Sequence, residues 1–125
     1  MASLLIVEGV GQGRLIRLAE PLISIGRDDT CSFQILDPLV SRKHLQIKLD
    51  PALGKHFAAD YRSAHGVAVN GKTITLDVAL NEGDRITIGS TTLVYLEADH
   101  ADAASAAAAL KKPDEWKRST LIDRP

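Results

Sequence analysis

Short apolar runs separated by turn residues recur throughout residues 3–97, and this pattern is the strongest constraint on the fold. In residues 22–26 and 45–49, for example, apolar and polar side chains alternate. A period of two places successive side chains on opposite faces of a strand, so each such run predicts a strand with one buried face. The expected strands are residues 3–8, 14–18, 22–26, 33–35, 45–49, 56–61, 67–69, 85–88 and 91–97. Many short strands with regular turn signals are typical of an all-β sandwich or barrel.

The dipeptide Asn70-Gly71 is the sharpest turn signal in the chain. A type I′ hairpin turn needs a positive φ at both central positions, and asparagine followed by glycine adopts these angles readily. We therefore expect a tight hairpin between two strands at this point, and we assign Asn70 a structural role.

The chain has 125 residues, which suits one domain with an adequate hydrophobic core. Aromatic residues make up only 4% of it, so we expect a core of valine, isoleucine and leucine. The composition changes after Glu97. Residues 99–112 are rich in alanine, the residue with the highest helix propensity. We thus predict a folded domain at residues 1–98, a short helix or linker at residues 99–112, and a mobile polar tail at residues 113–125 that contains Trp116.

Charge and targeting signals argue against several classes of protein. The formal net charge is −1, whereas nucleic-acid-binding domains carry a clear basic excess, so we expect no nucleic-acid partner. No run approaches the roughly 20 apolar residues of a transmembrane helix, and the N-terminus lacks the basic region of a signal peptide. We therefore expect no membrane partner and a cytoplasmic location. The single cysteine, Cys31, cannot form an intramolecular disulfide and is interpreted as an ordinary small side chain.

Polar and basic residues gather at three junctions between expected strands and loops. Residues 26–28 (Gly-Arg-Asp) close one strand, and residues 41–44 (Ser-Arg-Lys-His) precede another. Residues 62–66 (Arg-Ser-Ala-His-Gly) lie between two more. In a sandwich, loops of this kind collect at one end and build a binding site there, so we expect these groups to be neighbours.

The residue types at these junctions suit recognition of a phosphate group. The guanidinium of Arg27 is a rigid fork of donors that matches phosphate oxygens. Ser41 offers a hydroxyl and a backbone N–H, and Arg42 adds a second cation. Each hydrogen bond to a charged partner contributes about 1.5–3 kcal/mol, so two or three of them reach about 5–8 kcal/mol before the costs of binding. That sum fits micromolar affinity with help from the flanking peptide.

The order and spacing of these groups resemble the forkhead-associated (FHA) domain family. The resemblance rests on Gly26-Arg27, Ser41-x-x-His44, Ser63-x-x-Gly66 and Val69-Asn70-Gly71, and it covers residues 3–97. It implies a β-sandwich of about eleven strands whose loops at one end bind phosphothreonine peptides. By this resemblance, the residues expected to bind the phosphopeptide are Arg27, Ser41, Arg42, Ala64 and His65. Those expected to support the site are Gly26, His44, Gly66 and Asn70, with His44 bracing the Ser41 loop.

His65 departs from the pattern of the family. The family has Asn-Gly-Thr where this chain has His65-Gly66-Val67. The family's asparagine both donates to and accepts from the peptide backbone beside the phosphothreonine. A neutral imidazole also has one donor and one acceptor, but its shape differs. Because histidine titrates near neutrality, we expect binding that is weaker or sensitive to pH.

Simpler interpretations exist for each of these residues. Taken alone, Arg27 reads as a surface arginine and Ser41 as a turn cap, and only their combined spacing favours phosphate binding. For Arg42 and His65, a ligand contact and a plain surface role stay equally open. His56 has no partner in the sequence and is interpreted as a surface histidine.

A catalytic site is not expected. Ser41 and His44 lie three residues apart on a loop without an orienting acid, whereas nucleophilic catalysis needs a nucleophile, a base, an orienting group and an oxyanion site. Asp28 and Asp29 are too few carboxylates for a metal site. We therefore predict no enzyme activity, no cofactor and no metal.

The tail contains a candidate phosphorylation site at Thr120. Lys117-Arg118-Ser119 precedes it, which resembles the target of a kinase that prefers basic residues. Asp123 stands three residues after Thr120, at the position that FHA domains commonly read. One interpretation is self-association, in which phosphorylated Thr120 binds the site of another copy in trans. The other is a solvated tail with a chance match.

Three functions compete at this point. The first is a phosphothreonine-dependent adaptor in Ser/Thr kinase signalling, with the kinase or its substrate as partner. The second is an FHA-like scaffold or assembly module of a larger complex that works without phosphate. Retention of Gly26, Arg27, Ser41 and His44 favours the first, and the substitution at His65 is a weaker argument for the second. The third, an enzyme, has no support in the sequence.

Overall fold

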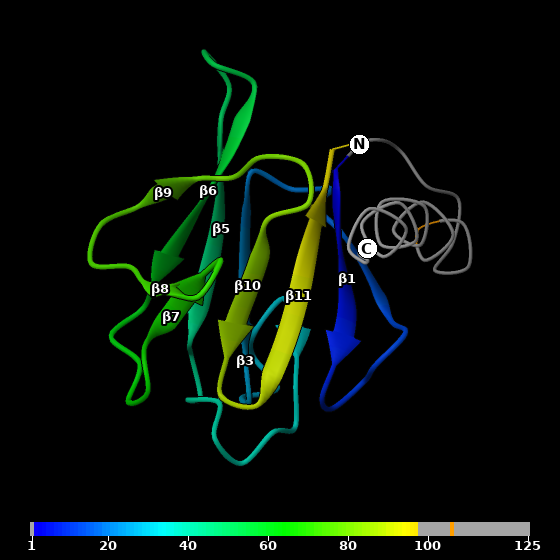
Figure 1. The fold of residues 1–125 in the computed structure, drawn as a ribbon, viewed down its shortest axis with the longest axis vertical. Coiled ribbons are helices and arrows are strands. Elements are labelled where there is room, and N and C mark those ends of the chain that lie inside the picture. The colour runs from blue at the N-terminus through cyan, green and yellow to red at the C-terminus, as the bar shows by residue number, and fades with distance from the viewer. Residues whose placement is uncertain (1, 98–105, 107–125) are drawn as a thin grey trace, which may run out of the picture.

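Eleven short strands form two facing β-sheets in the computed structural model, which describes residues 2–97 and residue 106 (Figure 1). The strands are β1 (Ser3–Glu8), β2 (Leu15–Arg17), β3 (Leu22–Gly26), β4 (Phe33–Gln34), β5 (Leu45–Asp50), β6 (Lys55–Asp60), β7 (Val67–Val69), β8 (Lys72–Thr73), β9 (Val78–Ala79), β10 (Arg85–Ile88) and β11 (Thr91–Leu96). The all-β sandwich expected from the alternating pattern is confirmed.

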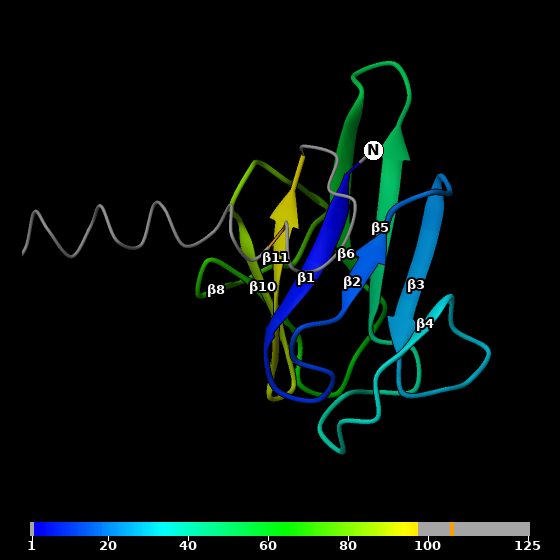
Figure 2. The same ribbon diagram turned by 90° about the vertical axis from the view of Figure 1, so that its right-hand side faces the viewer.

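The two sheets bring distant parts of the chain together. One sheet has the strand order β2-β1-β11-β10-β7-β8, and the other has the order β4-β3-β5-β6-β9. Strands β3 and β4 run parallel, and the other neighbouring pairs of described strands are antiparallel. As a result, the β3–β4 and β4–β5 connections lie at the end of the sandwich opposite the N-terminus (Figure 2).

The short strands β8 and β9 were not indicated by alternation. Each has two residues, too few to display a period of two. Strand β9 exists because Val78 and Ala79 pair with β6, a contact that depends on the tertiary fold. Strand β8 follows the predicted hairpin, in which Asn70 and Gly71 have φ angles of 53° and 84°. The hairpin expected at this dipeptide is confirmed.

An aliphatic core fills the space between the sheets, as the scarcity of aromatic residues predicts. Alternate residues of the central strands point into it, and many are fully buried. They include Leu4, Ile6, Ile25, Leu45, Ile47, Ile86, Ile88 and Leu93. Burying one such side chain stabilises the fold by about 1.5–3 kcal/mol. This packing holds the strand ends in place, and the strand ends in turn position the loops.

The prediction that His56 lies at the surface is wrong. Its side chain is only 8% exposed, and its Nδ1 atom lies 2.8 Å from the Tyr95 hydroxyl. The register of β6 turns His56 and Ala58 toward the core. Tyr95 is 39 residues away in the sequence, so the partner of His56 becomes visible only in the folded chain.

A second apolar cluster covers the outer face of the six-stranded sheet. It consists of Leu5, Val94, Leu96 and Ala106, with Val7 and Leu15 packed against it. Ala106 is helical and fully buried, so it lies on strands β1 and β11 and leaves β11 covered on both faces. The other residues of the predicted Ala-rich segment lie outside the described residues, as does the tail with Trp116, Thr120 and Asp123.

Candidate functional site

Three loops meet at the end of the sandwich opposite the N-terminus. They are the β3–β4 loop (residues 27–32), the β4–β5 loop (residues 35–44) and the β6–β7 loop (residues 61–66). Backbone hydrogen bonds join them: the Arg27 N–H donates to the Ser41 carbonyl at 3.0 Å, and the Tyr61 N–H donates to the His44 carbonyl at 2.9 Å. Pairing of β5 with both β3 and β6 therefore makes neighbours of the three groups singled out in the sequence.

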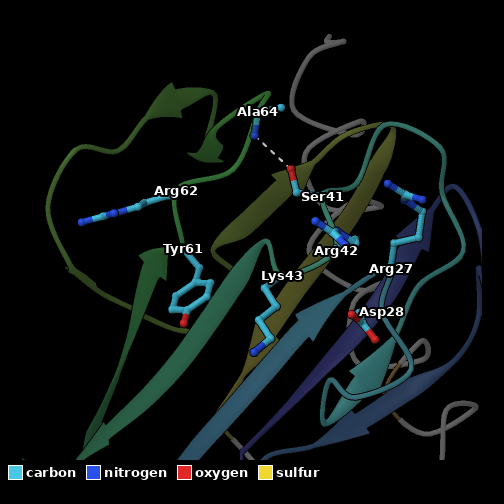
Figure 3. Close-up of a pocket in the computed structure, with 8 residues that line it drawn as sticks. All are labelled: Arg27, Asp28, Ser41, Arg42, Lys43, Tyr61, Arg62 and Ala64. Carbon is cyan, nitrogen blue, oxygen red and sulfur yellow. Dashed lines mark hydrogen bonds between the residues drawn. The ribbon is translucent and has the colours of Figure 1, made fainter.

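The loops surround an open pocket of about 640 Å³ (Figure 3). Its lining consists of Arg27, Asp28, Ser41, Arg42, Lys43, Tyr61, Arg62 and Ala64. Of the residues predicted to bind a phosphopeptide, four line the pocket, namely Arg27, Ser41, Arg42 and Ala64. The fifth, His65, is exposed and lies outside this lining.

Arg27 is anchored at its base and open at its tip. Its Nε–H donates to the Val40 carbonyl at 2.9 Å, which fixes the plane of the guanidinium. The terminal nitrogens make no hydrogen bond to the described residues, and the side chain is exposed. An anion in the pocket therefore meets a guanidinium whose position is set in advance.

Ser41 presents its hydroxyl in a defined orientation. The hydroxyl oxygen accepts the Ala64 N–H at 2.9 Å (Figure 3). This bond engages a lone pair and leaves the hydroxyl proton available to donate. Ser41 thus links two loops and still offers a donor to a ligand.

His44 braces these loops from inside. It is fully buried, and its Nδ1 accepts the Ser41 N–H at 2.9 Å. Because a backbone N–H only donates, Nδ1 is unprotonated and the ring proton lies on Nε2. Nε2 then donates to the Gly66 carbonyl at 2.7 Å. Gly66 adopts a φ of 80°, and its own N–H donates to the Ser63 hydroxyl at 2.9 Å.

A glycine is required at position 26 because the backbone of Arg42 passes close to it. A Cβ at this position would lie 2.2 Å from the carbonyl oxygen of Arg42, well inside contact distance. That carbonyl also accepts the Asp28 N–H at 3.0 Å and the thiol of Cys31 at 3.2 Å. Burial and the neighbouring Asp28 raise the pKa of the Cys31 thiol, so the protonated thiol donates to this loop.

Asp37 anchors the pocket loop from below, and sequence reasoning missed it. Its fully buried carboxylate accepts the Leu39 N–H at 2.9 Å and the Ser90 N–H at 2.9 Å. It also accepts the hydroxyls of Ser90 at 2.7 Å and Thr91 at 2.8 Å. Burial disfavours the charge, yet these hydrogen bonds outweigh it and lower the pKa of Asp37 to about 2. In the sequence, Asp37 before Pro38 reads only as a turn.

Positive charge dominates the pocket. Four cationic side chains line it, and Asp28 is the single carboxylate among the lining residues. The pKa of Asp28 is lowered chiefly by the Thr30 N–H, then by the Thr30 side chain, with a smaller effect of the Arg42 charge. Lys43, Tyr61 and Arg62 were not predicted as site residues. The signal for them was their position inside or directly before the motif groups.

The comparison with known families decides the identity of the fold. The sequence profile of the FHA domain family matches residues 23–89, more than half of the chain. This chain belongs to the FHA domain family. The match spans the β3–β4, β4–β5 and β6–β7 loops of the FHA domain described above.

Relatives and solved structures agree with this assignment. The chain is 31% identical to the glycogen accumulation regulator GarA of Mycolicibacterium smegmatis over 101 residues, covering 81% of this chain and 62% of GarA. One solved structure comes from a structural and functional analysis of phosphothreonine-dependent FHA domain interactions. It shares 29% identity and a TM-score of 0.70, over 79% of this chain and 98% of the other.

A second solved structure is the FhaA FHA domain complexed with the intracellular domain of Rv3910. It shares 30% identity and a TM-score of 0.68, over 76% of this chain and 99% of the other. The chain spans less than two thirds of the length of each curated relative that it matches, from 3% to 62%. No helix of the described residues is long and apolar enough to cross a membrane.

Proposed function

We propose that this FHA domain is a non-catalytic adaptor that binds phosphothreonine in a partner protein. FHA domains are modules that typically bind phosphothreonine peptides. The observation that supports the proposal most directly is the convergence of Arg27, Ser41 and Arg42 on one pocket. A phosphothreonine carries a charge of about −1.5 to −2 and three acceptor oxygens. The open guanidinium of Arg27 and the free hydroxyl proton of Ser41 match those oxygens.

The hydrogen bonds of His44 support binding without catalysis. A general base for Ser41 would have to lie within hydrogen-bond reach of its hydroxyl. His44 instead uses Nδ1 for the backbone N–H of Ser41 and Nε2 for the carbonyl of Gly66. Both ring nitrogens are therefore occupied by structural partners, and the Ser41 hydroxyl serves as a ligand contact.

A Ser/Thr kinase or one of its substrates is the proposed partner. This follows from the chemistry of the ligand, since a kinase must first phosphorylate the threonine. The FhaA FHA domain, 30% identical to this chain, was solved with an intracellular domain of another protein. By analogy, the described pocket is proposed to dock a phosphorylated segment of a larger partner.

Binding to a degenerate phosphothreonine library tests the proposal, with phosphoserine and unphosphorylated libraries as comparisons. We expect selective binding to phosphothreonine peptides in the micromolar range. Arg27→Ala should abolish it, and Arg27→Lys should weaken it strongly, because a lysine keeps the charge but loses the fork and the bond to Val40. Lys72→Ala, an exposed cation of β8 outside the pocket, is the matched control. Equal binding by Arg27→Ala and the unmodified protein would contradict the proposal.

One observation favours a second candidate, a scaffold that works without phosphate. His65 occupies the position at which the family contacts the peptide backbone, and it lies outside the pocket lining. A folded domain that binds none of the phosphorylated libraries would support this scaffold function.

We also propose Thr120 as a ligand for the pocket of a second copy. The proposal rests on the sequence around it, with basic residues before Thr120 and Asp123 three residues after. Phosphorylation of the full chain at Thr120 should then convert monomers into larger species, and Arg27→Ala should prevent this conversion. Sedimentation velocity measures both, and an unchanged oligomeric state after phosphorylation rejects self-association.

A further inference from the structure

The β5–β6 hairpin projects beyond the sandwich at the end opposite the cationic pocket of Arg27 and Ser41 (Figure 1, Figure 2). Strand β3 pairs with β5 only as far as Lys48, and β9 pairs with β6 only at Phe57 and Ala58. The last residues of the hairpin therefore pair only across the hairpin itself. Its turn, residues 51–54, extends into solvent, and all four residues are exposed.

Leu53 lies in this turn, and 65% of it is exposed. The turn has a defined shape, because the Asp50 carboxylate accepts the N–H groups of Ala52 at 3.0 Å and of Leu53 at 3.3 Å. The Gly54 N–H also donates to the Asp50 carbonyl at 2.8 Å. A single exposed leucine is ordinary on a soluble protein. Leu53 differs because an ordered, projecting turn presents it, so that little conformational freedom is lost when it is buried in a contact.

A second pocket lies on the outer face of the five-stranded sheet, at the base of the same hairpin. It has a volume of about 410 Å³, and its lining consists of Lys48, Leu49, Asp50, Pro51, Phe57 and Asp77. Because His56 and Ala58 face the core, Phe57 between them faces outward. The side chains of Leu49, Pro51 and Phe57 give this Phe57 pocket its apolar surface. Its volume lies within the range of about 300–1,000 Å³ of small-ligand pockets, so it has room for a leucine side chain.

The charges around the Phe57 pocket permit two copies of the chain to meet there. Lys48 and Asp77 are about half exposed and form an ion pair at 3.2 Å, and Asp50 is the third charged residue of the lining. One cation and two carboxylates thus stand together. The cationic pocket, with four cations and one carboxylate, would repel its own copy. Charge therefore favours self-association at the hairpin end over the other end of the sandwich.

We propose that two copies of this chain associate through their hairpin ends, with Leu53 of each copy inserted into the Phe57 pocket of the other. In a two-fold dimer every contact occurs twice, so one surface must carry both the inserted side chain and the pocket that receives it. The β5–β6 hairpin carries both. The cationic pocket lies at the other end of β5, six residues or about 20 Å away, and stays open in the dimer.

Sedimentation velocity of the unphosphorylated full chain tests the dimer. The contact is confined to the hairpin and its pocket, so we expect a weak dimer with a Kd of about 10–100 μM. Concentrations from about 5 μM to about 500 μM span this value. Leu53→Ser should weaken the dimer by about tenfold or more, because the lost contact is present twice. Leu36→Ser is the matched control: Leu36 is 64% exposed, lies in the β4–β5 loop, and should leave the Kd unchanged.

The dimer needs neither a phosphate group nor the cationic pocket. Arg27→Ala and a rise in salt concentration should both leave its Kd within about twofold, because the contact is mainly apolar. Arg27→Ala is expected to abolish phosphopeptide binding, so the failure of one proposal is visible without the other. Association through phosphorylated Thr120, by contrast, requires both the phosphate and Arg27.

Amide chemical shifts in NMR spectra of the unmodified protein, recorded on dilution, locate the contact. Leu49, Leu53 and Phe57 should shift, whereas Ser41 should not. A monomer at every concentration overturns the proposal and leaves the Phe57 pocket to a different occupant. A dimer that Leu53→Ser leaves intact, one that Leu36→Ser weakens equally, or shifts confined to other surfaces also overturn it.

Discussion

Two buried histidines lie near opposite ends of strand β5, and their environments differ sharply. At the pocket end, His44 is fully buried and both ring nitrogens have backbone partners. At the other end, His56 is 8% exposed, and among the described residues only its Nδ1 has a partner, the Tyr95 hydroxyl. Its Nε2 is buried and forms no hydrogen bond within residues 2–97. A buried polar group with all its partners fixes the loops around it, whereas one with a missing partner lowers the stability.

The two ends of the sandwich also differ in the pKa values of their buried groups, and Asp37 represents the pocket end. Four hydrogen bonds lower its pKa to about 2 in spite of its burial. At the other end, burial lowers the pKa of His56, and burial with the nearby carboxylates of Glu97 and Glu82 raises the pKa of Tyr95 to about 12. Burial thus favours the neutral form of a group where hydrogen-bond donors are few. A buried group stays charged where the backbone supplies such donors. At the pocket end, the buried polar groups of His44 and Asp37 have the hydrogen-bond partners that they need.

Replacement of His44 should show the largest effect at the pocket end. His44→Ala removes two buried hydrogen bonds and leaves the Ser41 N–H and the Gly66 carbonyl without partners. We expect a loss of about 3–4 kcal/mol in the free energy of unfolding. Phosphopeptide binding should fall below detection, because the Ser41 loop loses its brace. Urea unfolding and peptide titration measure the two effects, and a variant that retains full affinity would show that the brace is dispensable.

The pH dependence of the free energy of unfolding in Asp37→Asn tests the role of the buried charge at the pocket end. At neutral pH we expect a loss of about 2–3 kcal/mol, because charge-assisted hydrogen bonds from Ser90 and Thr91 are weakened. The folded pKa lies below the ordinary value of 3.8, so the stability contributed by the charge is present above 3.8 and is lost as the pH falls toward 2. The difference between the two proteins should therefore shrink across this window in urea titrations. A difference that stays constant from pH 7 to pH 2 would rule out this role of the ionised carboxylate.

The smallest effect is expected at the far end. The double variant His56→Leu/Tyr95→Phe removes both members of the polar pair and keeps the volume of the site similar. Its free energy of unfolding at pH 7 should change by less than about 1 kcal/mol. Because the pKa of His56 is lowered in the fold, the unfolded chain binds its proton more readily, and the native protein loses stability as the pH falls below about 6.5. The double variant should lack this loss in thermal unfolding between pH 7 and pH 5, and an unchanged acid sensitivity would assign it to other groups.

Much of the fold follows from local patterns in the sequence. Runs such as β3, β7 and β10 have the expected bounds, because alternation reports directly on which face of a strand is buried. The turn at Asn70 follows from its dipeptide for the same local reason. Strand β9 and the burial of His56 could not be predicted, since both depend on partners brought together by the packing of the two sheets.

Some features of the candidate site could likewise be predicted from the sequence, and others could not. The spacing of Arg27, Ser41 and Gly66 identified three loops that the structure brings together. It did not indicate that Asp37 anchors the β4–β5 loop through Ser90, 53 residues away. It also did not indicate which of the neighbouring residues, such as Lys43 and Tyr61, line the pocket.

The sequence by itself determined the sandwich, the hairpin at Asn70 and the membership of the motif residues in one family, because strand periodicity, turn angles and motif spacing are properties of neighbouring residues. The tertiary structure alone decided the pairing of His56 with Tyr95 and the anchoring of the pocket loop by Asp37. It also decided that four cations meet in one pocket while His65 stays outside it. These contacts join residues far apart in the chain, and their energies depend on burial and on distances that only the packed sheets establish.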